Sequence, residues 1–388
     1  PQTKFLKIQI AGTNGKGSAC AFLDAMLRSA KLRVGLYTSP HLVSMTERIR
    51  IGGENIGERE FARLATRVRK ASGLLVERGD LDSVPTYFEQ VTAIALLAFA
   101  EVKVDVAILE TGLGGRLDAT TAADAEIAAI TRIDRDHERY LGSLLTKIAA
   151  EKAAIIRPNT QFAVLGEQTA NIQRLLARRC RESKVPFIDA GEAAAKVESD
   201  GIEFTTLRTK YRVKKLGLAG RHQVENAKVA IALAEHLSSR FKITRKSIES
   251  GLKNASNPGR LERIGRFLLD GAHNPSGVKA LANYIRENVE APVTIIFAAM
   301  EDKNSRAMMR ELFPHARTIV LTQASNSRYT PYQRLLKQMP DDISKERTFV
   351  TGNVESALQV AKAADPDAVI VVAGSLYLVG EVRARLVP

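Results

Sequence analysis

The sequence predicts an α/β protein with two domains, each organised around a mainly parallel sheet. Short β-branched or leucine-rich runs alternate with longer amphipathic patterns of helical period. This alternation is typical of parallel strands joined by helices that cover both faces of a sheet. A chain of 388 residues is also longer than one typical domain. The expected strands are 5–10, 104–109, 127–133, 162–165, 266–269, 293–297, 318–321 and 368–372, and the clearest helices are 19–30, 88–100, 224–237, 278–289 and 354–364.

A change of composition places the boundary between the two domains. Residues 254–259 are small and polar with one proline and one glycine, which is typical of a linker. We therefore expect an N-terminal domain over 1–257 and a smaller C-terminal domain over 258–388. Within the first domain, short alternating segments at about 192–218 predict a small antiparallel β region.

Composition excludes several classes of protein. The apolar fraction of 45% and the charged fraction of 26% are ordinary for a soluble globular protein. No apolar run is long enough to cross a bilayer, and no secretory signal is recognisable. Cys20 and Cys180 are too few for a disulfide framework, which fits the cytoplasm. The net charge of +14 is compatible with nucleic acid or with a small anion such as ATP. The absence of tryptophan and of interleaved aromatic and basic residues favours the small anion.

A glycine-rich turn with a lysine follows the first expected strand. Residues 11–18 read Ala-Gly-Thr-Asn-Gly-Lys-Gly-Ser and run directly into a helical pattern. Glycines let backbone N–H groups approach phosphate oxygens, while the lysine and the helix N-terminus add positive charge. The match to the usual phosphate loop is imperfect, because Ile10 replaces a glycine and Gly17 replaces the hydroxyl residue after Lys16. A plain strand-to-helix turn is the alternative. The place of residues 11–18 directly after an apolar strand favours a P-loop-type ATPase domain.

Polar residues that could bind Mg²⁺ follow three further strands. Ser39 follows the run 34–37, Glu110 follows 104–109, and His137 follows 127–133. Ligands gather beyond the carboxyl ends of strands in open α/β sheets, and Mg²⁺ takes oxygen ligands. Each residue alone is better explained as a turn, cap or structural group, but together they favour a metal–phosphate site. Asp134 and Asp136 either supplement that site or are solvated.

Motifs along nearly the whole chain give a specific resemblance. The chain resembles the folylpolyglutamate synthase/dihydrofolate synthase family of Mur-type ligases. The matching segments are 11–18, 38–42, 47–49, 86–89, 110–120, 150–153, 222–227, 258–262, 270–275, 302–303 and 374–380. The phosphate loop begins at residue 11, earlier than in the family, so we expect either that the N-terminus is trimmed or that the folate pocket differs from that of the family.

The resemblance implies roles for individual residues. The catalytic residues would be Lys16, Lys152 and His273, with Lys152 carried as a carbamate that could serve a second Mg²⁺. ATP would be bound by Thr13, Asn14, Gly15, Lys16, Gly17, Ser18, Asn226, Arg260 and Asp270. Mg²⁺ would be held by Ser18, Ser39, Glu110 and His137. The substrates would contact Thr86, Phe88, Glu89, Gly114, Arg116, His273 and Ser375.

The resemblance also implies the reaction. The chain is expected to be a monomeric ligase that uses ATP and two Mg²⁺ ions to add L-glutamate to a reduced folate or dihydropteroate through an acyl phosphate. The C-terminal domain, Rossmann-like in form, would be the glutamate-ligase domain, and neither nucleic acid nor membrane is expected as a partner. Three alternatives stay open: another Mur-type amino-acid ligase, a nucleotide-binding switch protein, and a nucleic-acid-binding protein.

Overall fold

Two large sheets, one in each of two units, organise the chain. The computed structural model describes residues 1–325 and 328–387. The N-terminal unit consists of Pro1–Asp134, Ser143–Gly217 and Gln223–Ser256. The C-terminal unit consists of Arg135–Gly142, Leu218–His222 and Asn257–Pro388. Two short segments that precede residue 257 thus belong to the C-terminal unit. A single boundary at residue 257 does not describe this division of the chain. Each unit is described by itself below.

The N-terminal unit contains an eight-stranded sheet with the order β4-β3-β2-β5-β1-β6-β7-β8. Six strands are parallel, while β3 and β4 pair antiparallel at one edge. Every residue of the central strand β1 is buried. The strands are β1 (Leu6–Ala11), β2 (Val34–Tyr37), β3 (Ile49–Ile51), β4 (Glu54–Asn55), β5 (Val106–Glu110), β6 (Ile127–Ile130), β7 (Phe162–Leu165) and β8 (Phe187–Asp189).

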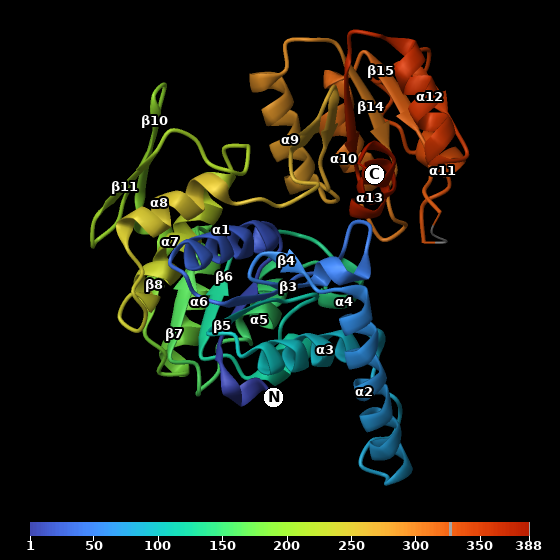
Figure 1. Cartoon of the computed structure of the whole chain (residues 1–388). Helices are drawn as coiled ribbons and strands as arrows, with labels where there is room; N and C mark the ends of the chain where they lie inside the picture. Colours follow the sequence, from blue (N-terminus) through green and yellow to red (C-terminus); the bar gives the residue numbers. More distant parts are fainter. Residues whose placement is uncertain (326–327, 388) are drawn as a thin grey trace. The chain divides into compact units, whose positions relative to one another are not determined.

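Helices cover both faces of this sheet (Figure 1). One face carries α1 (Lys16–Ser29), α7 (Gln223–Leu237) and α8 (Arg245–Asn254), and the opposite face carries α3 (Tyr87–Val102), α5 (Leu145–Ala153) and α6 (Ala170–Glu182). Right-handed crossovers place α1, which leads from β1 towards β2 across β5, on the face opposite to α3, α5 and α6. The polar helix α2 (Glu58–Glu77) extends away from the sheet. Short 3₁₀ helices lie at Gln2–Lys4, Met45–Arg48, Ala119–Ala123 and Ala190–Glu192.

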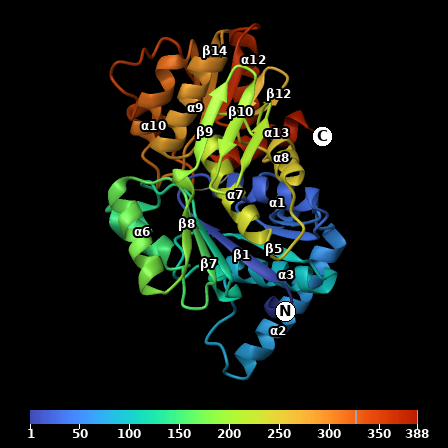
Figure 2. The ribbon, with the colours of Figure 1, turned by 90° about the vertical axis from the view of Figure 1, so that its left-hand side faces the viewer.

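A second, small sheet lies where the antiparallel β region is expected (Figure 2). It consists of β9 (Ala194–Glu198), β10 (Gly201–Thr205) and β11 (Lys210–Val213). The central strand β10 pairs antiparallel with both neighbours.

The C-terminal unit has a six-stranded sheet with the order β12-β13-β17-β14-β15-β16. Only β12 runs antiparallel. The strands are β12 (Glu262–Ile264), β13 (Phe267–Leu269), β14 (Val293–Phe297), β15 (Thr318–Leu321), β16 (Thr348–Val350) and β17 (Val369–Ala373). The helices are α4 (Glu138–Leu141), α9 (Pro275–Asn288), α10 (Ser305–Leu312), α11 (Tyr332–Lys337), α12 (Val354–Ala364) and α13 (Leu376–Leu386), with a 3₁₀ turn at Phe313–His315.

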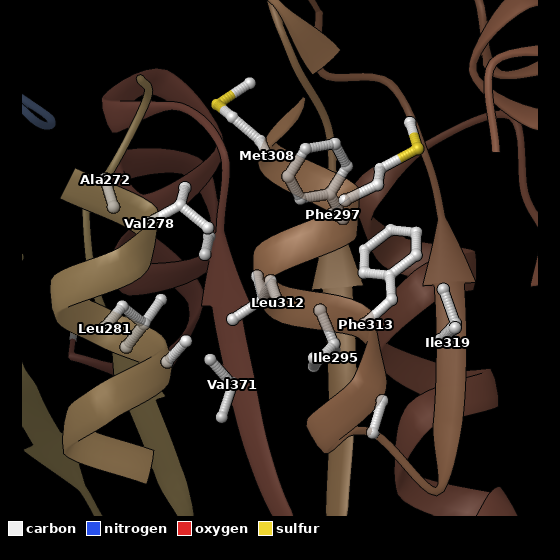
Figure 3. Packing of buried hydrophobic residues seen from close by; sticks show 14 of the residues in the cluster. Ala272, Val278, Leu281, Ile295, Phe297, Met308, Leu312, Phe313, Ile319 and Val371 are labelled. Carbon is white, nitrogen blue, oxygen red and sulfur yellow. The ribbon is translucent and has the colours of Figure 1, made fainter. Parts of the chain in front are cut away.

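Aromatic and aliphatic side chains fill the core between this sheet, α9 and α10 (Figure 3). The rings of Phe297 and Phe313 meet edge to face, with centroids 5.3 Å apart. Val371 of β17 and Leu281 of α9 belong to the same cluster. This core fixes β13, β14 and β17, whose carboxyl ends carry the polar loops described below.

The predicted fold class is confirmed, since a largely parallel N-terminal sheet is followed by a separate, smaller C-terminal α/β sheet. Strand β6 is shorter than the expected run 127–133, because the chain leaves the sheet after Ile130. None of the helices formed by the described residues is long and apolar enough to cross a bilayer.

Candidate active site

The loop that joins β1 to α1 has the backbone geometry of a phosphate-binding loop. Gly12 and Gly15 have φ angles of 151° and 89°, which other residues rarely adopt. A Cβ atom on Gly12 would lie 2.0 Å from Oγ1 of Thr131, and one on Gly15 would lie 2.0 Å from Oδ1 of Asn226. Thr131 also donates a 2.8 Å hydrogen bond to the carbonyl of Asn14. Glycines at positions 12 and 15 therefore allow the loop to pass between the end of β6 and the start of α7.

The first turn of α1 is suited to binding an anion. The helix begins at Lys16 with Gly15 as its N-cap, and no described residue provides a side-chain cap hydrogen bond there. Backbone N–H groups and the helix dipole favour negative charge at such an N-terminus. Ser18 is buried in the same turn. The residues predicted to bind ATP phosphates thus lie together in one turn and its preceding loop.

Two lysine side chains converge on the carbonyl of Gly12. Nζ of Lys16 donates to this oxygen at 3.0 Å and to the carbonyl of Thr13 at 3.3 Å. Nζ of Lys152, which is 5% exposed in the last turn of α5, donates to the same Gly12 oxygen at 2.9 Å. The loop therefore meets two lysine side chains as well as helix N–H groups, and the positive charge of Lys16 favours a polyphosphate.

Glu110 and Ser39 lie together at the carboxyl edge of the sheet. Glu110 ends β5, is 6% exposed, and accepts a 3.2 Å hydrogen bond from the backbone N–H of Ser39. The neighbouring strands β2 and β5 place Tyr37 opposite Leu109. The residues that follow these two strands therefore emerge side by side, next to the phosphate loop.

The oxygen donors of Ser39 and Glu110 fit Mg²⁺. Mg²⁺ prefers oxygen ligands and usually takes one or two carboxylates together with phosphate and water. The described part of the chain contains no group of three His, Cys, Asp or Glu side chains that could hold a metal. Burial, followed by the negative charge of Glu110, raises the pKa of the nearby Cys20 thiol, so this cysteine is not a candidate nucleophile.

The other predicted ATP and metal groups divide between the units. Asn226 lies in the N-terminal unit, where it faces Gly15. His137, Arg260 and Asp270 belong to the C-terminal unit. The structure thus brings Ser39, Glu110, Lys152 and Asn226 to the phosphate loop, while the remaining three belong to the second unit.

Asp270 holds the turn after β13. Its carboxylate accepts hydrogen bonds from the backbone N–H groups of Leu261 at 2.8 Å and Ala272 at 2.9 Å. Burial lowers the pKa of the neighbouring His222, against the opposing charge of Asp270. Asp270 therefore fixes the backbone that leads to His273.

Two of the predicted substrate residues form a helix cap. Oγ1 of Thr86 accepts the backbone N–H of Glu89, and Oε2 of Glu89 accepts both the N–H and the hydroxyl of Thr86. These hydrogen bonds lower the pKa of Glu89. Thr86 and Glu89 therefore start α3 as a capping box, whether or not they also touch a substrate.

Phe88 lies against the loop that follows β5. A Cβ atom on Gly112 would lie 2.6 Å from Cζ of Phe88, so the ring and the loop are in close approach. Gly114 has a φ angle of 66°, and Nε of Arg116 pairs with Oε1 of Glu151 at 3.0 Å. The loop is thus held between α3 and α5.

Asp118 ties the same loop to itself. Oδ2 accepts the N–H groups of Gly112 and Leu113 at 3.0 and 2.9 Å, and Oδ1 accepts the N–H and hydroxyl of Thr120. Nε2 of Gln9, in the buried centre of β1, reaches the hydroxyl of Thr120 at 2.9 Å. A polar network under the loop therefore fixes its shape.

A cavity of about 1040 Å³ lies between α3, α5 and α6. Small apolar residues form much of its wall, and charged groups including Glu89, Arg116 and Asp118 line it as well. Ligand pockets typically combine an apolar wall with a few polar groups in this way. Of the predicted substrate residues, Glu89 and Arg116 line this cavity, whereas Thr86, Phe88 and Gly114 are not among its lining residues. The alanines of the wall are Ala93, Ala119, Ala122, Ala150, Ala153 and Ala154.

His273 and Ser375 occupy neighbouring loops of the C-terminal unit. They follow the paired parallel strands β13 and β17, and the N–H of Gly374 donates to the carbonyl of Ala272 at 2.9 Å. Ser375 caps α13, and its hydroxyl lies 2.8 Å from that of Tyr329. The structure therefore places both predicted glutamate-binding residues just beyond the carboxyl ends of two neighbouring strands of the C-terminal sheet.

Family models match both parts of the chain. The Mur ligase middle domain matches residues 10–234, and the Mur ligase glutamate ligase domain matches residues 259–376. The dihydrofolate synthase/folylpolyglutamate synthase of Bacillus subtilis is 31% identical over 402 residues, which cover 100% of this chain and 91% of that protein. The chain belongs to the folylpolyglutamate synthase/dihydrofolate synthase family of Mur ligases.

Other family members differ in length from this chain. A probable bifunctional folylpolyglutamate synthase/dihydropteroate synthase of Haloferax volcanii is 35% identical over 97% of this chain but only 45% of that protein. A Halobacterium salinarum protein of the same description is matched over 46% of its length. The chain therefore spans about half the length of these two relatives.

Solved structures of the family have the same fold. The folylpolyglutamate synthase of Mycobacterium tuberculosis, complexed with ADP and AMPPCP, superposes with a TM-score of 0.93 at 30% identity, over 100% of this chain and 92% of that one. The bifunctional enzyme of Yersinia pestis, complexed with AMPPNP and Mn ion, has a TM-score of 0.84 at 30% identity, over 98% and 88%.

Within this family fold, the structure also identifies polar residues that sequence reasoning left without a role. Lys303 lies in the loop between β14 and α10, and its side chain is 7% exposed. Asp136, left open between a metal ligand and a solvated acid, is buried against Lys303 and His273, so the solvated interpretation is wrong. Asp134 remains near the phosphate loop, where its carbonyl accepts the hydroxyl of Thr13 at 2.9 Å. The signal in the sequence that could have pointed to these residues is that each is a polar residue in the segment that follows an expected strand.

Proposed function

We propose that this chain is an ATP-dependent ligase that adds L-glutamate to the carboxylate of a folate or dihydropteroate. The convergence of Lys16 and Lys152 on the Gly12 carbonyl, beside Glu110 and Ser39, carries the proposal. This arrangement suits transfer of a phosphoryl group from ATP. The family match of the C-terminal unit to a glutamate ligase domain supports an amino acid as the second substrate.

The proposed reaction has two steps. The acceptor carboxylate attacks the γ-phosphorus of ATP, the bond to the bridging oxygen of ADP breaks, and an acyl phosphate forms. The neutral amine of glutamate then attacks the acyl carbon, inorganic phosphate leaves with the bonding electron pair, and the nitrogen releases one proton to give the amide. Lys16 and the N-terminus of α1 stabilise the charge that develops on the phosphoryl oxygens. No protein nucleophile is required.

Ser39, Glu110 and His137 are the residues proposed to hold Mg²⁺, together with Ser18 beside the phosphates. Bound there, the metal would neutralise phosphate charge during the in-line transfer. The Yersinia pestis enzyme with AMPPNP and Mn ion supports a divalent metal in this family. In the N-terminal unit, the oxygen atoms of Ser39 and Glu110 fit that assignment.

The acceptor is proposed to enter the cavity between α3, α5 and α6. Its alanine-rich wall accepts a flat apolar ring, and Arg116 at the loop end offers positive charge to a carboxylate. The names of the relatives, which specify folylpolyglutamate and dihydrofolate synthesis, support a folate or pterin acceptor. We further propose that the chain acts as a monomer, since all predicted site residues belong to one chain. We also propose that it acts in the cytoplasm, because its two cysteines are buried and free.

Lys152 is proposed to carry a carbamate. Its amine would attack carbon dioxide, form a new N–C bond and release one proton, which turns a cation into an oxygen ligand for a second Mg²⁺. Its place beside Gly12 would put this anion close to the metal and phosphates. A crystal grown with bicarbonate, Mg²⁺ and an ATP analogue is expected to show planar density beyond Nζ of Lys152. A bare amine in a fully ordered side chain would contradict the proposal.

One assay tests the proposed function. Purified protein, ATP, Mg²⁺ and L-glutamate are combined with dihydropteroate or with tetrahydrofolate, and released phosphate is measured. We expect phosphate release that requires both glutamate and one of the acceptors, with a product heavier by one glutamyl residue. Release that is independent of glutamate with both acceptors would overturn the proposal. Activity only with a different carboxylate would instead assign the chain to another Mur-type ligation.

A further inference from the structure

A buried carboxylate joins a lysine and a histidine in the C-terminal unit. Asp136 has a side-chain exposure of 6%, and its Oδ1 lies 2.5 Å from Nζ of Lys303. Its Oδ2 lies 3.3 Å from Nε2 of His273 and accepts a 3.2 Å hydrogen bond from Nδ2 of Asn274. Three polar groups from two loops thus meet one carboxylate, which the segment Arg135–Gly142 contributes from far away in the sequence.

The geometry fixes the side chains of both His273 and Lys303. The carbonyl of Gly271 can only accept, so Nδ1 of His273 donates to it at 2.8 Å, and the ring is held between this oxygen and Asp136. Lys303 is 7% exposed, and its second acidic neighbour, Asp302, is farther away at 3.6 Å and 30% exposed. Asp136 therefore pairs directly with Lys303.

We propose that Asp136 is a positioning residue for the amino-acid substrate, which it serves by holding Lys303 and His273 in place to receive a substrate carboxylate. The inference rests on the proposed function. The ammonium of Lys303 has three hydrogens, and Asp136 directs one of them, so the side chain is oriented before the substrate arrives. Preorganised donors of this kind lower the cost of binding an anion.

The position of Ser375 supports this assignment. Ser375 follows β17, which lies between β13 and β14 in the sheet. His273 follows β13 and Lys303 follows β14. The three polar residues therefore follow three adjacent parallel strands, where ligands gather in open α/β sheets. Asp136 is the only acid among the described residues that an ion pair joins to both His273 and Lys303.

The substitution Asp136→Asn tests the role. It keeps the size of the side chain but removes the charge that holds Lys303. We expect the KM for glutamate to rise by about tenfold or more, since loss of one partner of a buried charge pair weakens binding strongly. The KM for ATP and the Mg²⁺ concentration for half-maximal rate are expected to change by less than about twofold, because a residue that acts through the amino-acid site affects that substrate selectively.

Two further variants make the result specific. In a double-mutant cycle with Lys303→Gln, the effects of the two substitutions on glutamate KM are expected not to add, since one acts through the other. Asp341→Asn removes an equal charge from an exposed pair with Arg306 in the same unit, where Asp341 is 96% exposed, and is expected to leave all constants unchanged.

A third variant covers the case in which Asp136→Asn does not fold. Asn274→Asp keeps an acceptor for the N–H of Gly277, which caps α9, but places a second negative charge beside Asp136. Repulsion would displace Asp136, so the same selective rise in glutamate KM is expected. An active wild-type protein with an unchanged glutamate KM in the folded variant would overturn the positioning role alone. A wild type that releases no phosphate with glutamate would overturn the proposed function and this role with it.

Discussion

Replacing Lys16 with alanine is expected to reduce glutamate-dependent phosphate release by about a thousandfold. Nζ of Lys16 donates hydrogen bonds to two carbonyl oxygens of the phosphate loop, that of Gly12 at 3.0 Å and that of Thr13 at 3.3 Å. In the transition state the charge of the transferred phosphoryl group is spread over its three equatorial oxygens, and the ammonium stabilises this arrangement more than it stabilises bound ATP. The rate constant should therefore fall much further than ATP affinity.

The measurement is the rate of phosphate release at saturating ATP, with ADP binding measured in parallel by calorimetry. Lys70→Ala is a matched control, because Lys70 is exposed on α2, the helix that extends away from the sheet that carries the phosphate loop. It should retain the wild-type rate. A Lys16→Ala protein that melts at the wild-type temperature and still turns over at more than about a tenth of the normal rate would contradict the assignment of the phosphate loop.

The second large effect is expected for Glu110→Gln. Glutamine keeps an oxygen that can accept the N–H of Ser39, so the end of β5 should stay folded. The substitution removes the carboxylate that accepts the N–H of Ser39, and with it the charged group proposed as a Mg²⁺ ligand. A metal-dependent step should therefore slow by about a hundredfold, and more Mg²⁺ should be needed for half-maximal rate.

A Mg²⁺ titration of the rate checks this expectation. Glu77→Gln, at the exposed end of α2, makes the same chemical change away from the site and should leave the titration curve in place. If Glu110→Gln lowered the rate without moving the curve, Glu110 would act on the phosphate loop by charge alone rather than as a ligand. If neither rate nor curve changed, the metal site would have to be placed elsewhere.

The phosphate loop and its neighbours could be predicted because each depends on local sequence. Gly12, Gly15 and Lys16 follow an apolar strand directly, and Glu110 ends another. The adjacency of Ser39 and Glu110 was less accessible, since it depends on β2 pairing with β5 rather than with β1. Strand order is set by tertiary packing, which local patterns do not encode.

The role of Thr86 and Glu89 could have been recognised more fully from the sequence. A threonine followed three positions later by a glutamate, before an apolar run, is the signature of a capping box. The structure contains that cap, whereas the family resemblance implies substrate contacts for the same two residues. By contrast, nothing local could pair Asp136 with Lys303, because 167 residues separate them and neither lies in a regular pattern.

The interleaved make-up of the two units has a consequence for synthesis on the ribosome. The chain leaves one unit for the other at five points, between residues 134 and 135, 142 and 143, 217 and 218, 222 and 223, and 256 and 257. The segment Arg135–Gly142 therefore emerges long before Lys303, its buried ionic partner, has been translated. A fragment cut at residue 257 would lack residues 135–142, so Lys303 would have no carboxylate of Asp136 to pair with.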